Sequence, residues 1–145
     1  MKSSEFMRAL PEAIRPKVSK RLRNFKVATR SWLVQLYFDD LRLHYEVLNL
    51  GERRKRLEIG LHFESQHRDL NTRLLGGMQA HLIEIKAKLG QSFEAEPWDK
   101  GWTKAYETIP LEKFSAEYLE RVAARVAQVI GVLEPIRRGV RAYRR

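Results

Sequence analysis

The stretch LHYEVLNLGERRKRLEIGLHFE, residues 43–64, predicts two strands joined by a charged turn, and it decides the fold. Successive side chains of a strand point to opposite faces, so residues of one parity share a face. Seven odd-numbered residues form a set that can all be buried, whereas a set of six even-numbered residues includes no large apolar side chain. The odd set is Leu43, Tyr45, Val47, Leu57, Ile59, Leu61 and Phe63; the even set is His44, Glu46, Glu58, Gly60, His62 and Glu64. We therefore expect a sheet with one dry face and one polar face.

The even set also carries the chain's one internal repeat, because His-Tyr-Glu at 44–46 is echoed by His-Phe-Glu at 62–64. A six-residue turn would place each histidine opposite the glutamate of the other tripeptide, with Cβ atoms about 4.5–5.5 Å apart. One interpretation is a set of cross-strand hydrogen bonds or ion pairs on a solvated face. The other is a metal site or a proton-transfer pair. We favour the solvated face, assign no metal, and keep four catalytic candidates: His44, Glu46, His62 and Glu64.

Composition bounds the class of protein. With 145 residues the chain is expected to form one domain, since domains of roughly 100–200 residues are typical. A net charge of +10 favours a polyanionic partner, either nucleic acid or an acidic protein surface. The chain has no Cys, which excludes disulfides, thiolate metal ligands and a cysteine nucleophile. No signal peptide and no apolar run of about 18 residues is present, so we expect a cytoplasmic protein without membrane contact.

Helices are predicted on both sides of the hairpin. Residues 16–38 carry apolar side chains at spacings of three and four, as does the segment 69–89, which stops at Gly90. A third helix is expected to begin near Ser115, a suitable N-cap, and to end or kink at Pro135.

A second hairpin is predicted over residues 93–109. Asp99-Lys100-Gly101 suits a three-residue turn with a positive φ at the glycine. This turn would place Trp98 and Trp102 side by side and Glu96 opposite Lys104. Two Trp side chains beside lysines could stack on bases, but a structural aromatic pair is the interpretation we favour.

These elements predict an α+β fold in the order α-ββ-α-ββ-α. Its antiparallel sheet of about four strands, formed by two hairpins, would be packed on one face by three helices. Residues 1–15 are expected to form a flexible N-terminal arm, residues 16–135 a single domain, and residues 136–145 a basic disordered tail.

The leading functional hypothesis is a non-enzymatic module that binds nucleic acid or another polyanion through phosphate contacts. The first basic cluster lies on the predicted first helix, the second at the hairpin tip and the third in the tail. The contact residues would be Lys20, Arg23, Lys26, Arg30, Arg53, Arg54, Lys55, Arg56, Arg137, Arg138 and Arg141.

Two alternatives remain open. The chain could be a protein-interaction or oligomerising subunit with an acidic partner. It could also be an enzyme that uses the His/Glu face for metal or acid–base chemistry. Glycine-rich phosphate loops and His-Glu-x-x-His helices are missing, so the motifs indicate no cofactor.

Overall fold

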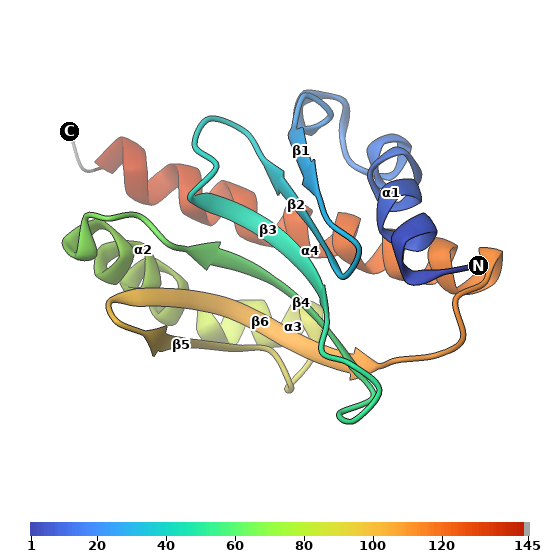
Figure 1. Ribbon diagram of the computed structural model, residues 1–145. Helices are drawn as coiled ribbons and strands as arrows, with labels where there is room; N and C mark the ends of the chain where they lie inside the picture. The colour runs from blue at the N-terminus through green and yellow to red at the C-terminus, as the bar shows by residue number, and fades with distance from the viewer. Residues whose placement is uncertain (144–145) are drawn as a thin grey trace.

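The structure is a computed structural model that describes the backbone of residues 1–143 and the side chains of residues 1–140 (Figure 1). Within these residues the chain forms four α-helices, two short 3-10 helices and six strands. In chain order they are α1 (Ser3–Ile14), η1 (Arg15–Lys17), η2 (Lys20–Leu22), β1 (Lys26–Thr29), β2 (Leu33–Tyr37), β3 (Leu43–Asn49), β4 (Arg56–Phe63), α2 (Arg68–Ala80), α3 (Leu82–Leu89), β5 (Glu94–Asp99), β6 (Trp102–Pro110) and α4 (Ala116–Tyr143).

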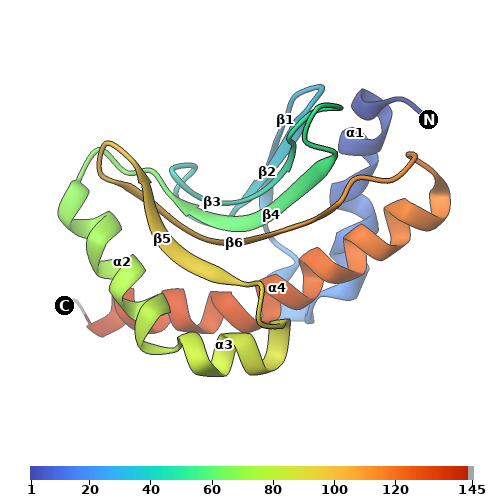
Figure 2. The same cartoon turned by 90° about the horizontal axis from the view of Figure 1, so that it is seen from below.

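The strands form one antiparallel sheet in the order β1-β2-β3-β4-β6-β5. Helices α2, α3 and α4 lie against one side of the sheet, and among the described residues no helix lies over its concave side (Figure 2). The seven apolar residues at odd positions of β3 and β4 are buried in the main core, as predicted. The α+β class and the antiparallel sheet are confirmed, but the expected four strands and three helices are too few.

The predicted helix over residues 16–38 is wrong. This segment forms η1, η2 and the hairpin of β1 and β2, which pairs Thr29 with Val34. Within β2 the buried side chains Val34 and Leu36 alternate with half-buried ones, which is the period of a strand. β-Branched Val27, Thr29 and Val34 also favour a pleated strand over a helix. The spacing of three and four is accidental, because the apolar residues that form it belong to separate elements and not to one helix.

The flexible N-terminal arm is also corrected, because residues 3–14 form α1. Phe6, Met7, Leu10 and Ile14 are fully buried and lie on one face of this helix. The ring of Phe6 lies 4.6 Å from that of Phe114, which ties α1 to the segment before α4. Tertiary packing of this apolar face holds the helix although Pro11 lies inside it.

The later part of the chain follows the predictions more closely. The segment 69–89 forms two helices, α2 and α3, which meet at His81, and α3 ends at Gly90 with a φ of +108°. The turn of the second hairpin is confirmed, with a φ of +91° at Gly101. Glu96 pairs with Lys104 as expected.

Helix α4 begins where the sequence predicts but ends later. The Ser115 hydroxyl accepts a hydrogen bond from the Tyr118 N–H at 3.1 Å, which is the expected N-cap. The helix then continues through Pro135 to Tyr143, so the predicted disordered tail is helical over residues 136–143. Arg137 is buried beside Glu134 of the same helix, and the Tyr45 hydroxyl of β3 donates to Glu134 at 3.0 Å, which ties this part of the helix to the sheet.

Candidate metal centre

The register of the central hairpin brings the two histidines of the repeat side by side. His44 pairs with His62 across β3 and β4, and Glu46 pairs with Gly60. The predicted pairing of each histidine with a glutamate is therefore wrong by two residues. A shift of two residues preserves parity, so both histidines stay on the polar face as predicted. Their rings stack with centroids 5.5 Å apart.

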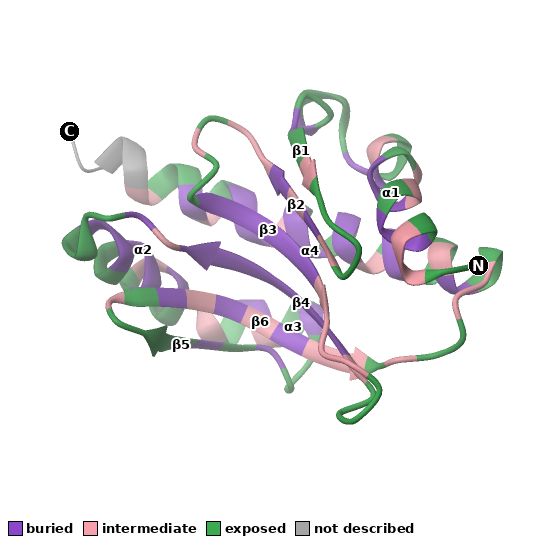
Figure 3. Ribbon diagram, viewed as in Figure 1, coloured by how far each residue is buried: buried purple, intermediate pink, exposed green. Residues whose placement is uncertain are grey.

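This polar face is buried rather than solvated. His44 and His62 are each 2% exposed, Glu58 is 4% exposed and Glu46 is 7% exposed. Figure 3 shows β3 and β4 buried along most of their length. These strands are the two central ones, with β2 and β6 beside them, and the Trp98 ring packs edge-on against His62 at 5.8 Å. The expected solvated face is thus corrected to a buried polar cluster.

His44 is held in one orientation by the backbone. Its Nδ1 lies 2.7 Å from the Leu41 carbonyl oxygen, which can only accept, so Nδ1 carries a proton. Its Nε2 lies 3.0 Å from Glu46 Oε1 and 3.3 Å from the Gln35 amide nitrogen. A carboxylate oxygen cannot donate to Nε2, so the contact with Glu46 requires a proton or a cation between the two atoms.

Both nitrogens of His62 face carboxylates. Nδ1 lies 3.0 Å from Glu64 and Nε2 lies 2.8 Å from Glu58. Burial alone would lower the pKa of His62, but the hydrogen bonds to Glu58 and Glu64 and the charge of Glu46 outweigh it and raise the pKa to about 9.

The carboxylates in turn are stabilised as anions. Burial would raise the pKa of Glu46, but the hydrogen bond from His44 and the charge of His62 lower it to about 2. The pKa of Glu58 is also lowered: burial opposes ionisation, while His62 and Lys104 favour it more strongly. The Lys104 ammonium lies 2.9 Å from Glu58 Oε1.

Three of these residues converge as a set of metal ligands. One donor atom from each of His44, Glu46 and His62 lies within 4.8 Å of the others. Zinc binds imidazole nitrogen and carboxylate oxygen at about 2.0–2.2 Å. Donor atoms this close together could be shared by one ion.

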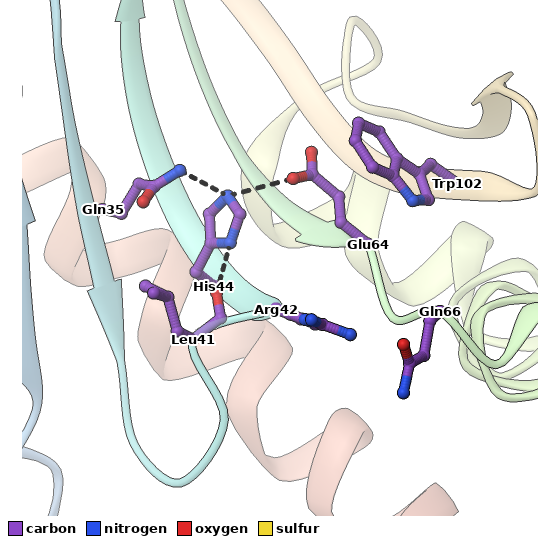
Figure 4. A pocket seen from close by; sticks show the side chains of 7 residues that line it. All are labelled: Gln35, Leu41, Arg42, His44, Glu64, Gln66 and Trp102. Atoms are coloured by element: carbon purple, nitrogen blue, oxygen red, sulfur yellow. Dashed lines mark hydrogen bonds and ion pairs between the residues drawn. The ribbon is translucent and has the colours of Figure 1, made fainter.

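Two pockets open onto the cluster from the concave side. The first, about 450 Å³, has His44 and Glu64 in its wall together with Gln35, Leu41, Arg42, Gln66 and Trp102 (Figure 4). The second, about 520 Å³, is lined by Glu46, Leu48, Leu50, Arg54, Glu58, His62, Glu96, Pro97, Trp98 and Lys104. Each pocket thus holds one histidine of the cluster, one Trp and one Arg.

The predicted basic clusters do not gather at this site. Helix α4 ends at the opposite end of the molecule from the turn between β3 and β4 (Figure 1). Most of the predicted contact residues are exposed, although Arg23 and Arg138 also form hydrogen bonds within the protein. Lys20, Arg23, Lys26, Arg30, Arg53, Arg54, Lys55 and Arg138 are exposed; Arg56 donates to Thr108, Arg137 is buried beside Glu134, and the side chain of Arg141 lies outside the described residues.

Three members of the site were not among the sequence candidates. Glu58 has the right parity in the central hairpin, and Lys104 shares a face with Glu96, so both could have been found from strand alternation. Gln35 could not, because its strand was mistaken for a helix.

Comparison with known proteins gives no relative that would indicate a role for this site, so its function is inferred from its geometry. No protein-family model, curated protein or solved structure matches the chain. Over the described residues, no helix combines the length and the apolar character that crossing a bilayer requires.

A tyrosine bonded to Glu96, which lines the second pocket, gives a test by alkaline titration. The Tyr106 hydroxyl donates to Glu96 at 2.5 Å, and this hydrogen bond, with burial and the charge of Glu96, raises the pKa of Tyr106 to about 12. Because the neutral phenol is favoured by folding, its contribution to stability is complete below pH 10 and is lost as the pH rises through 12. Absorbance at 295 nm should show that Tyr106 ionises at a lower pH in Glu96→Gln than in the unaltered protein. The variant Tyr106→Phe identifies which part of the absorbance change belongs to Tyr106. An identical titration of Tyr106 in Glu96→Gln and in the unaltered protein would contradict this prediction.

Proposed function

We propose that the protein binds a divalent transition metal ion on the concave face of its sheet, through His44, Glu46 and His62. The observation that carries the proposal is the anchoring of both imidazole rings. His44 Nδ1 contacts the Leu41 carbonyl oxygen and His62 Nδ1 contacts Glu64. The Nε2 atoms lie 3.0 Å (His44) and 3.9 Å (His62) from Glu46, and the Nε2 of His62 also contacts Glu58 at 2.8 Å. Metal-binding histidines characteristically use their second nitrogen in this way.

Charge balance supports the same proposal. With neutral histidines, the carboxylates of Glu46, Glu58 and Glu64 against the one ammonium of Lys104 leave two negative charges in a buried cluster. Either two protons on the imidazoles or one divalent cation neutralises them. Imidazole and carboxylate donors suit Zn²⁺, and two histidines with one carboxylate also suit Fe²⁺.

Three protein ligands would leave a coordination position open toward the pockets. A metal ion in such a site supplies a Lewis acid and lowers the pKa of a bound water molecule, which is the basis of metal-assisted hydrolysis. Glu58 lies 2.8 Å from His62 Nε2 and would be released from this contact when the nitrogen binds metal. It would then be placed to act as a fourth ligand or as a base.

Titration of chelator-treated protein with Zn²⁺ in a calorimeter tests the proposal. We expect one ion per chain, and we expect His44→Ala and Glu46→Gln each to weaken binding by about 100-fold or more, because each removes one of the three ligands. His67→Ala is the matched control, since His67 is exposed and lies outside the cluster. Circular dichroism checks that each variant is folded. Absence of binding, or equal losses in all three variants, would overturn the proposal.

Polyanion binding is a second proposal, which the net charge of +10 and the exposed Arg53 and Lys55 favour. It has less geometric support, because the basic clusters lie at different ends of the molecule and Arg137 is buried. Fluorescence anisotropy with labelled oligonucleotides should show binding that falls steeply with salt if this proposal holds. Binding to an acidic protein surface would use the same exposed side chains and stays open in the same way.

A further inference from the structure

The first pocket has the features of a small-molecule site in addition to its contact with the cluster. Its volume of about 450 Å³ lies within the 300–1,000 Å³ that is typical of ligand pockets. Its walls come from β2, the turn before β3, the link after β4, and β6, and His44 forms part of its wall (Figure 4). A ligand in this pocket would therefore lie beside the proposed metal.

Arg42 offers this pocket an uncommitted positive charge. Within residues 1–140 its guanidinium has no hydrogen bond or ion pair, although it lines the pocket. Its backbone is fixed, because its N–H donates to Asp40 at 2.9 Å and its carbonyl accepts from the Glu64 N–H at 2.8 Å. The Gln66 amide is likewise unpartnered within this range, and the two side-chain ends point toward each other in Figure 4.

The pocket also presents apolar surface. Trp102 is 36% exposed and is braced by Trp98, whose ring centroid lies 5.5 Å away. Leu41 is also exposed at the pocket. An exposed indole beside a free guanidinium can receive a molecule that has a flat apolar body and an anionic group.

The carboxylate of Glu64, in the wall of the first pocket, limits which anions can bind there. Glu64 is bonded to His62 Nδ1, which offsets its charge, but it would still repel a second negative charge. One guanidinium fork matches one carboxylate in bidentate geometry. A monoanionic carboxylate therefore fits this pocket better than a phosphate dianion.

We infer that this pocket binds an aromatic carboxylate, with its carboxylate on Arg42 and Gln66 and its ring against Trp102. The inference deepens the proposed function and rests on it in one respect: the bound molecule would lie next to the metal at His44. The contacts with Arg42 and Trp102 do not themselves need the metal.

Binding of 2-naphthoate tests the inference, measured by calorimetry and by quenching of Trp fluorescence in metal-free and Zn²⁺-loaded protein. We expect 2-naphthoate to bind and its neutral amide, 2-naphthamide, to bind at least about 10-fold more weakly, because the amide cannot form the charge-assisted pair. Naphthyl phosphate is expected to bind more weakly than the carboxylate.

Two variants locate the binding. Arg42→Gln should weaken 2-naphthoate binding about 10-fold or more, whereas Arg8→Gln should leave it unchanged, because Arg8 is exposed on α1 and lines neither pocket. Equal affinity for acid and amide, or equal losses in the two variants, would overturn the inference. If Zn²⁺ binds but 2-naphthoate binds neither form, the inference fails and the metal proposal stands. If 2-naphthoate binds in an Arg42-dependent way and Zn²⁺ does not bind, the metal proposal alone fails.

Discussion

Replacing Glu134 by Ala is expected to lower the free energy of unfolding by about 3–5 kcal/mol. The Glu134 carboxylate is fully buried and accepts hydrogen bonds from the Tyr45 hydroxyl at 3.0 Å, from Arg137 at 2.6 Å and from Arg138 at 2.7 Å. Without it, the guanidinium of Arg137 would stay buried, and within residues 1–140 the ion-pair partner that remains is Asp39, at 3.5 Å. A buried charge that loses its partner costs far more than an exposed one.

Urea denaturation followed by circular dichroism measures this loss. Glu120→Ala is the matched control, since it makes the same substitution on the same helix. Glu120 is exposed and contacts Lys17 at the surface, so its loss should cost at most about 1 kcal/mol. Similar values for the two variants would show that the Glu134 cluster does not hold α4 to the sheet.

The two faces of the central hairpin were predictable because alternation depends only on parity. Any even shift of register leaves Tyr45 on the apolar face and His44 on the polar one. The register itself depends on the turn, where Lys55 donates its N–H to Gly51 and Leu50 donates to Arg56. Such backbone hydrogen bonds leave no periodic trace in the sequence, and the pairing of His44 with His62 was missed for that reason.

Burial of the polar cluster could not be predicted from the hairpin alone. The side chains that cover His44 and His62 include Gln35 from β2 and Trp98 from β5, two strands that lie outside the hairpin. The ionic cluster of Glu134 was missed on similar grounds, because Tyr45 is 89 residues from Glu134 along the chain. In both cases a polar side chain is buried by residues of other elements, and the sequence does not show which elements lie beside it.

Gly60 is the position where the structure predicts a second large effect, from adding a single methyl group. It lies on β4 between Glu46 of β3 and Tyr106 of β6. A Cβ at Gly60 would lie 2.6 Å from the Cβ of Tyr106 and 2.8 Å from the carbonyl oxygen of Ala105. Both atoms belong to or adjoin the backbone of β6, so no rotation of a side chain can relieve the contact, and the two strands must separate.

Gly60→Ala should therefore lower the free energy of unfolding by about 1–3 kcal/mol, the usual cost of overpacking. Gly131→Ala provides a control of opposite sign, because a Cβ there meets no atom within 4 Å and Gly131 lies exposed on α4. Ala favours a helix over Gly by about 1 kcal/mol, so this variant should be more stable than the unaltered protein. If urea denaturation gave Gly60→Ala unaltered stability, β4 and β6 could not approach as closely as described.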